Sequence, residues 1–327
     1  MKSKICRLAV FCLVTVIMSS LLVACAAPTD EVTPSPIEIT DQIGRVVKLE
    51  KVPERIVSLA PSNTEILFAL GLGDKVVGVT EYCDYPPEAK EKEKVGGYSD
   101  ANTERIVALN PDLILIEDIH TDEVLPALEN LGLTVITIDP RNLDEVLESI
   151  ILIGEITGKD EEASRLVTEM RNRISVITDK TSKLTQAERP RVFYVIWHDP
   201  LMTVGTDTRI HELIEKAGGL NIIQDTEGYP AISLETLVEA NPQVIIVGSG
   251  MGEGADLPFQ FASTEPRLEN VDARINGRVY EIHTDIVGRP TPRMIDGLEQ
   301  LAKFIHPELL SRKNKPHKIE DFVGAPQ

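Results

Sequence analysis

The sequence is poor in aromatic residues and has no excess of positive charge. Aromatic side chains make up 4% of the 327 residues, and 33 Lys and Arg stand against 52 Asp and Glu, which gives a formal net charge of −19. A surface this acidic repels phosphate backbones instead of neutralising them. We therefore expect no nucleic-acid partner.

The short motifs of common hydrolases are also missing. The six histidines show neither the HExxH nor the HxH spacing that zinc enzymes use. No G-x-S-x-G sequence is present to form the nucleophile turn of a serine hydrolase. We expect a protein that is not an enzyme and that holds no resident metal or cofactor.

The chain does have the length and the apolar content for two compact units. Its mass is 36.0 kDa and 42% of its residues are hydrophobic. Beyond roughly 250–300 residues a single hydrophobic core stops growing. Because long low-complexity tracts are absent, disorder is excluded as the main state.

The N-terminus has the layout of an export signal. Lys2, Lys4 and Arg7 precede an uncharged apolar run from Leu8 to Ala24, which is the order of a basic and then a hydrophobic segment in secretory signals. The run leads into Leu22-Val-Ala-Cys25, which resembles the lipobox of bacterial lipoproteins. An ordinary signal peptide or an uncleaved anchor is the alternative.

The lipobox resemblance implies cleavage before Cys25 and attachment of lipid to that cysteine. We therefore predict a signal peptide over residues 1–24 and a lipidated tether over residues 25–36, on the outer face of the cell membrane. More than one acyl chain holds a protein on a membrane stably. Cys83 is then the one cysteine left, so no intramolecular disulfide can form.

From residue 37 onward, short apolar strands alternate with helices. The runs Arg55–Leu59 and Leu113–Ile116 predict strands, and a continuous Ile/Leu/Val run is typical of a strand that is covered on both faces. Strands and helices that alternate at these lengths predict parallel sheets built from βαβ units. Ser62 and Glu65 stand three residues apart and predict a capping box for the helix after the first strand.

A long helix is predicted between two α/β lobes. After Gly158, some 26 residues keep helical apolar spacing. The predicted fold class is α/β, with two parallel-sheet lobes joined by a single long helix. We divide the chain into an N-terminal lobe at residues 37–142, a helical linker at 143–188, a C-terminal lobe at 189–310 and a tail at 311–327.

An internal repeat supports the prediction of two similar lobes. The segment Glu104–Ile116 aligns with Glu235–Val247 at a constant offset of 131 residues, and five of the thirteen positions are identical. Each copy predicts a short helix that stops at Asn-Pro, because proline disfavours a helical residue before it. A buried strand then follows in each copy.

These features resemble the substrate-binding lipoproteins of bacterial ABC importers, of the class in which a helical backbone joins two lobes. The resemblance extends from Ile39 to about Pro307. It implies a monomer that captures cobalamin, haem or a ferric siderophore and delivers it to a permease dimer with its ATPase. Its most specific segments are Arg55–Glu65, Tyr82–Pro87, Glu104–Asp112 and Gly288–Arg293.

Within this class, Tyr82–Pro87 and the two glutamate-bearing helices are most similar to the cobalamin-binding members. We therefore expect cobalamin or a related corrinoid as the ligand. A ferric siderophore or haem is the alternative within the same transporter class. A surface ligand sensor without a transport role is the second alternative.

The resemblance also implies docking residues. Glu104 and Glu235 match the acidic positions that contact arginines on the two permease subunits. Each follows a capping-type residue, Asn102 or Ser233, by two positions. It would therefore lie in the first helical turn, where the helix dipole favours a carboxylate. Helix-start electrostatics alone is the alternative reading of both glutamates.

A ligand cleft is expected between the lobes, at loops that follow strand ends. A corrinoid is a broad apolar ring edged with amides, so aromatic faces in loops suit it. The family match places ligand contacts at three tyrosines and one aspartate, and Trp197 lies beside a further aromatic position. The predicted ligand-binding residues are Tyr82, Tyr98, Trp197, His198, Tyr229 and Asp285.

The ligand role of His198 and that of the aromatic residues each have an alternative. His198 could ligate cobalt or haem iron through a neutral imidazole, or it could be an ordinary hydrogen-bonding histidine. The aromatic residues could pack between the lobes without touching a ligand.

Overall fold

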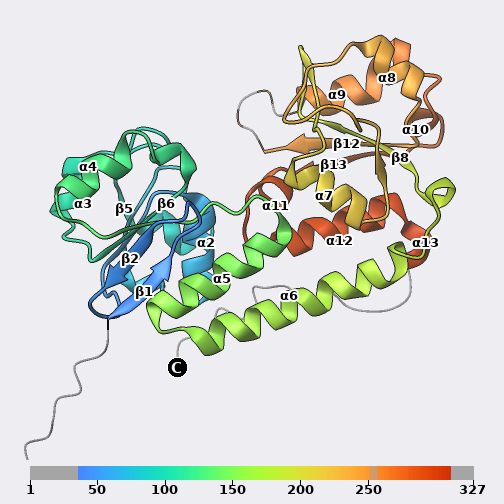
Figure 1. The fold of residues 1–327 in the computed structure, drawn as a ribbon. Helices are drawn as coiled ribbons and strands as arrows, with labels where there is room; N and C mark the ends of the chain where they lie inside the picture. Colours follow the sequence, from blue (N-terminus) through green and yellow to red (C-terminus); the bar gives the residue numbers. More distant parts are fainter. Residues whose placement is uncertain (1–35, 251, 253, 255, 311–327) are drawn as a thin grey trace, which may run out of the picture. The chain divides into compact units, whose positions relative to one another are not determined.

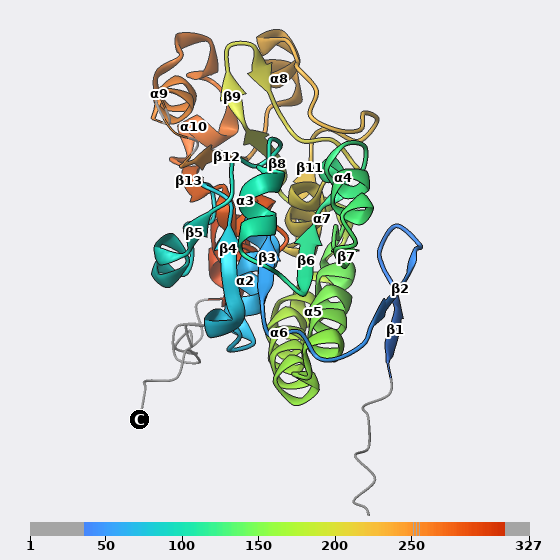
Figure 2. The same ribbon diagram turned by 90° about the vertical axis from the view of Figure 1, so that its left-hand side faces the viewer.

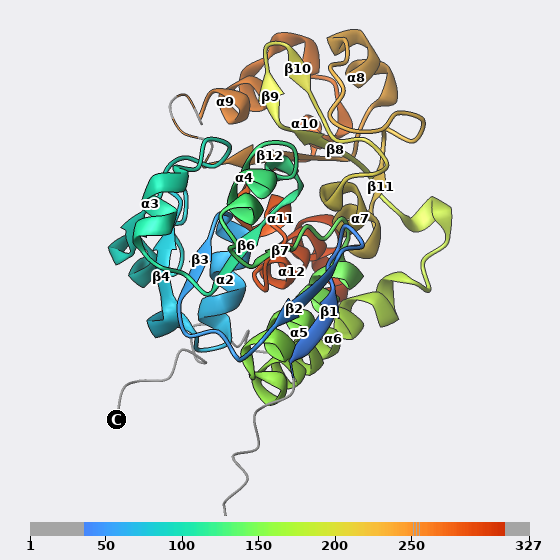
Figure 3. The same cartoon turned by 60° about the vertical axis from the view of Figure 1, so that its left-hand side comes forward.

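The computed structural model describes residues 36–250, 252, 254 and 256–310. The predicted signal peptide, Cys25, nearly all of the predicted tether and the tail at 311–327 lie outside these residues. The described chain begins with an antiparallel hairpin of β1 (Ile37–Thr40) and β2 (Val46–Leu49). The hairpin lies beside α5 (Leu143–Thr157) (Figure 3). The side-chain amide of Gln42 in the hairpin turn donates to the Ser149 hydroxyl of α5 at 2.9 Å.

Five parallel strands form the N-terminal sheet. They are β3 (Ile56–Ser58), β4 (Val76–Val79), β5 (Glu93–Lys94), β6 (Leu113–Ile116) and β7 (Val135–Thr137). The helices of this half are α2 (Pro61–Ala69), α3 (Thr103–Ala108) and α4 (Val124–Asn130). The strand order is β5-β4-β3-β6-β7 (Figure 2). Because strand side chains alternate, Ile56 and Leu115 pack with α2 and α5, whereas Val57 and Ile114 pack with α3 and α4.

Four parallel strands form the C-terminal sheet, in the order β11-β8-β12-β13. They are β8 (Arg191–Val195), β11 (Leu220–Asn221), β12 (Val244–Ser249) and β13 (Val279–His283). A small hairpin pairs β9 (Trp197–His198) with β10 (Leu201–Met202). The helices are α7 (Arg209–Lys216), α8 (Leu234–Ala240), α9 (Leu257–Thr264), α10 (Asp272–Ile275), α11 (Asp285–Gly288), α12 (Met294–Ile305) and α13 (Pro307–Leu310).

The long helix between the two sheets is α6 (Asp160–Thr181), which has 22 residues. The sequence predicted a helix four residues longer, because the helical spacing of apolar residues continues beyond Thr181, where the helix ends. Gly158 separates it from α5 and adopts a left-handed conformation with φ of +68°, as helix-ending glycines do. The helix packs against α5 and α12 (Figure 1). No helix in the described part of the chain is long and apolar enough to cross a membrane.

One cluster of buried side chains extends through both halves. It includes Leu115 of the N-terminal sheet, Met170 of α6 and Ile246 of the C-terminal sheet. The lobes are therefore joined by a continuous apolar core as well as by the chain. Burial of this area is the main favourable contribution to their association.

The internal repeat is present in three dimensions. Asn110 and Asn241 both adopt positive φ, at 46° and 43°, which asparagine tolerates better than most residues. In each copy an arginine, Arg55 or Arg191, donates through Nε to the two carbonyls at the end of the helix. The two α/β lobes and the long helix confirm the predicted fold class.

The capping box predicted at Ser62 and Glu65 is wrong. Helix α2 begins after Ala60, has Pro61 in its first turn, and has no side-chain cap. Both polar side chains are buried, at 2% and 3% exposure, and they are hydrogen-bonded to residues far away in the sequence. The local spacing predicted a cap, but both side chains form hydrogen bonds with residues from other elements of the fold.

Candidate functional site

A pocket of about 460 Å³ lies between the two lobes. Pro61 follows β3, Tyr82 follows β4 and Glu117 follows β6. The carboxyl ends of parallel strands meet at one edge of a sheet, which is where α/β proteins bind ligands. The lining residues are Pro61, Ser62, Tyr82, Tyr98, Ser99, Asp100 and Glu117 from the N-terminal lobe, with Arg209, Gly288, Arg289 and Pro290 from the C-terminal lobe.

The two tyrosines predicted from the N-terminal lobe both line this pocket. Tyr82 is 59% exposed, so its ring offers an open face to a ligand. Tyr98 is less exposed, and its hydroxyl donates to a carboxylate oxygen of Glu117. Burial, and then the charge of Glu117, raise the pKa of Tyr98, so Tyr98 is a neutral hydroxyl donor at physiological pH.

Acidic residues lie close enough to Tyr98 to act on its hydroxyl. Asp139 follows β7, and its carboxylate lies 2.7 Å from Nη2 of Arg141. Burial is the main cause that raises the pKa of Asp139 to about 6; the charges of Asp118 and Glu117 act in the same direction, and Arg141 opposes them. Ionised Asp139 is therefore less stable in the folded chain than in water.

Replacing Asp139 by Asn should stabilise the protein at neutral pH. A carboxyl group with a raised folded pKa binds more protons in the folded state than in the unfolded state, so its ionisation removes stability as pH rises from about 4 to 6. We expect Asp139→Asn to raise the free energy of unfolding by about 1–3 kcal/mol at pH 7 and by much less at pH 4. Urea unfolding at the two pH values measures this. The exposed control Asp122→Asn should show no pH-dependent difference, and an equal effect of Asp139→Asn at both pH values would contradict the assignment.

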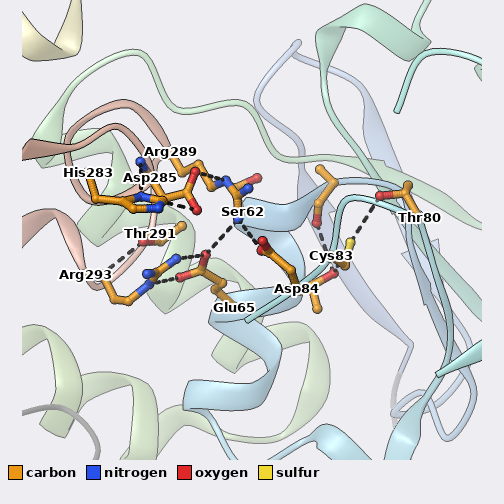
Figure 4. Close-up of polar contacts among 12 residues, drawn as sticks. Ser62, Glu65, Thr80, Cys83, Asp84, His283, Asp285, Arg289, Thr291 and Arg293 are labelled. Carbon is orange, nitrogen blue, oxygen red and sulfur yellow. Dashed lines mark hydrogen bonds and ion pairs between the residues drawn. The ribbon is translucent and has the colours of Figure 1, made fainter. Parts of the chain in front are cut away.

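A buried ion pair connects the lobes beside the pocket (Figure 4). The Glu65 carboxylate is 3% exposed and accepts from Nε of Arg293 at 2.7 Å and from Nη2 at 2.5 Å. Burial raises the pKa of Glu65, and the Arg293 guanidinium opposes that shift. The Arg293 guanidinium also lies 3.9 Å from the centre of the Tyr85 ring, at cation–π distance.

Arg289 forms a second set of contacts across the lobes. Its Nη1 lies 2.7 Å from Asp84 and 3.6 Å from Glu65, and its Nε lies 2.9 Å from Asp285. Although burial acts in the opposite direction, the Arg289 hydrogen bond lowers the pKa of Asp84. Asp285, a predicted ligand contact, thus points to Arg289 (Figure 4) and is not itself in the pocket lining.

The other predicted ligand residues belong to the C-terminal lobe and are not in the lining of this pocket. Trp197 and His198 form β9, with ring centres 5.1 Å apart, so Trp197 lies in a short strand and not in the predicted loop. Within the described residues, Nδ1 of His198 has no hydrogen-bond partner. Tyr229, which is 54% exposed, precedes Ala231, and Ala231 pairs with Met202 on β10. None of these three aromatic side chains lines the pocket.

The two predicted docking glutamates lie in equivalent positions. Glu104 is in the first turn of α3 after its cap Asn102, and Glu235 is in the first turn of α8 after its cap Ser233. Both side chains are exposed. Arg267 lies 3.8 Å from Glu235, a distance at which an exposed ion pair contributes little.

Several polar residues of the site were not predicted from the sequence. They include Glu65, Glu117, Arg209, Arg289 and Arg293. Arg289 and Arg293 are part of the segment Gly288–Arg293, which carried the family resemblance, so a signal for them was present. Glu117 directly follows a buried strand, and its position after a strand end was the signal that could have indicated it.

Comparison with known proteins establishes the family. Residues 56–286 match the periplasmic binding protein family. The chain is 34% identical over 301 residues to the uncharacterized ABC transporter substrate-binding lipoprotein YvrC of Bacillus subtilis, with 88% of this chain and 94% of that protein covered.

Solved structures show the same fold. The periplasmic vitamin B12 binding protein BtuF of Vibrio cholerae has a TM-score of 0.66 and 32% identity, over 77% of this chain and 96% of its own. A periplasmic heme binding protein from Pseudomonas aeruginosa has a TM-score of 0.69 and 26% identity, over 79% and 94%.

The chain therefore belongs to the periplasmic binding protein family. It is the extracytoplasmic substrate-binding component of an ABC transporter and not an enzyme. This confirms the resemblance to substrate-binding proteins of ABC importers that the sequence motifs indicated. Its relatives include both vitamin B12 and haem binders.

Proposed function

We propose that this protein captures cobalamin or a related corrinoid in the pocket between its lobes. The observation that supports this most is the pair of tyrosines, Tyr82 and Tyr98, in the lining of the pocket of a chain that is 32% identical to a vitamin B12 binding protein. Aromatic rings offer faces to a broad apolar macrocycle. Polar groups around them would accept hydrogen bonds from its peripheral amides.

The protein would then deliver its ligand to a permease dimer driven by an ATPase. Glu104 and Glu235 would contact one permease subunit each, because they occupy equivalent helix starts in the two lobes. A lipid on Cys25 would hold the protein at the membrane. The protein would act as a monomer. The lipoprotein name of the Bacillus subtilis relative supports the lipid anchor.

Haem is the second candidate ligand. The likeness to a heme binding protein of Pseudomonas aeruginosa favours it. A ferric siderophore is a further ligand of the same transporter class.

Calorimetric titration of the full-length protein in mild detergent distinguishes these ligands. We expect one-to-one binding of cyanocobalamin, with Tyr82→Ala raising Kd about tenfold because an exposed ring face is lost, which is about 1.4 kcal/mol. Tyr82→Phe, which keeps the ring, should bind within about twofold of wild type on the same argument. Ile275→Ala, at another exposed apolar side chain, is the control. Heat with haem but none with cyanocobalamin would overturn the corrinoid assignment and leave the transport role intact.

A further inference from the structure

The carboxylate of Glu117 forms part of the pocket lining and accepts hydrogen bonds from two side-chain hydroxyls. Glu117 is 6% exposed and directly follows β6. One of its oxygens accepts from the Ser62 hydroxyl and the other accepts from the Tyr98 hydroxyl. All three residues line the pocket. We call Ser62, Tyr98 and Glu117 the acceptor floor.

The acceptor floor has no hydroxyl proton left for a ligand. A serine or tyrosine hydroxyl carries one proton, and an ionised carboxylate carries none. Because both hydroxyl protons point to Glu117, only the oxygen lone pairs of the two hydroxyls and the carboxylate remain to interact with a ligand. A ligand atom that meets this surface must therefore donate a hydrogen bond.

The Tyr98 part of the floor is held by a second buried group. Nε2 of His120 lies 2.7 Å from the backbone carbonyl oxygen of Tyr98. The two rings meet edge to face, with centroids 5.8 Å apart. His120 itself is fully buried. These contacts favour the orientation in which Tyr98 donates to Glu117.

The two arginines that line the pocket already direct donors to other groups of the protein. Arg289 already has carboxylates of Asp84 and Asp285 within 3 Å. Arg209 directs Nε to the carbonyl oxygen of Gly288 at 3.0 Å and Nη1 to that of Pro140 at 2.9 Å. Asp118 and Asp139 add negative charge beside Tyr98. A carboxylate on a ligand would therefore meet like charge in a partly dehydrated site, where repulsion is stronger than in water.

We propose that Glu117 is a specificity-determining residue, which accepts a hydrogen bond from an uncharged amide or a cationic group of the ligand and disfavours ligands that present carboxylates. This inference rests on the proposed function and deepens it. The periphery of a corrinoid carries primary amides, which donate, whereas haem carries two carboxylates. The acceptor floor thus favours the corrinoid over haem, and unpaired or like-charged polar groups supply such discrimination elsewhere.

The test compares Glu117→Gln with wild type in the full-length protein. The probes are cyanocobalamin, its monocarboxylic acids, in which one peripheral amide is hydrolysed, and haem. For wild type we expect the monocarboxylic acid that places its carboxylate at the floor to bind at least tenfold more weakly than cyanocobalamin. Glu117→Gln should weaken cyanocobalamin about tenfold and reduce the penalty on that acid to about threefold or less. It should also strengthen haem binding.

Controls separate charge from folding and from the proposed function. Glu91→Gln makes the same chemical change on an exposed side chain away from the pocket and should change none of the affinities. An unchanged melting temperature of Glu117→Gln shows that it folds. Cyanocobalamin binding by wild type with unchanged discrimination in Glu117→Gln would overturn this inference and leave the proposed function standing. Wild type that binds haem as tightly as cyanocobalamin would also overturn this inference alone. Wild type that binds haem but not cyanocobalamin, or that binds none of the probes, would overturn both.

Discussion

Replacing Arg293 by Met should destabilise the protein by about 3–5 kcal/mol at pH 7, because it leaves the Glu65 carboxylate buried without its partner. The two residues lie in different lobes and form a bidentate pair. Glu65 has a pKa that burial raises even with Arg293 present. Without Arg293 the opposing effect is removed, and the pKa of Glu65 should rise further.

The sign of the pH dependence follows from that shift. A carboxyl group with a raised folded pKa contributes least stability when it is ionised. The loss in Arg293→Met should therefore be smaller at pH 4, where Glu65 takes up a proton, than at pH 7. Denaturant unfolding monitored by circular dichroism at the two pH values measures this difference.

Two further variants make the test specific to the pair. Arg293→Met combined with Glu65→Leu should recover part of the loss, since a buried ion pair can often be replaced by apolar residues at little cost. Arg171→Met, at an exposed position of α6, should change the free energy of unfolding by less than about 0.5 kcal/mol. A loss below about 1 kcal/mol for Arg293→Met, equal at both pH values, would show that the pair contributes little.

Replacing both Glu104 and Glu235 by Ala should reduce transport at least tenfold while ligand affinity stays within about twofold. Each glutamate is exposed in the first turn of its helix, and neither lines the pocket. Loss of a charge that pairs across an interface costs binding energy, and tenfold corresponds to about 1.4 kcal/mol. Uptake of labelled cyanocobalamin by cells that carry the cognate permease and ATPase gives the first quantity, and calorimetry gives the second.

The matched control for docking is on one of the same helices. Glu239 lies one turn after Glu235 on α8 and is also exposed. Glu239→Ala should leave uptake unchanged. Equal losses for Glu239→Ala and Glu235→Ala would indicate general charge attraction to the permease, and full uptake by the double variant would refute the docking role.

The site was predictable only in part. Tyr82 and Tyr98 were expected at the cleft and both line the pocket, whereas Trp197, His198 and Tyr229 are not in its lining. Loop position and family match indicated Tyr229 as well as Tyr82 and Tyr98. Whether a loop residue reaches the pocket depends on how β9 and β10 fold back on the sheet, and a two-residue strand leaves almost no periodic signal.

Local sequence patterns were enough to predict the two α/β lobes, the long helix and the repeat with its capped helix starts at Asn102 and Ser233. These features depend on residues a few positions apart, because helix and strand periodicity and capping act over one or two turns.

The partners of the buried polar groups depend on contacts between distant parts of the chain. Glu65 meets Arg293, 228 residues away, and Glu117 meets Ser62, 55 residues away. Ser62 and Glu65 have a spacing typical of a local cap, yet both side chains form hydrogen bonds with these distant residues instead. A buried polar group must be hydrogen-bonded wherever the packing of strands and helices leaves a partner, and that packing is set by the whole core.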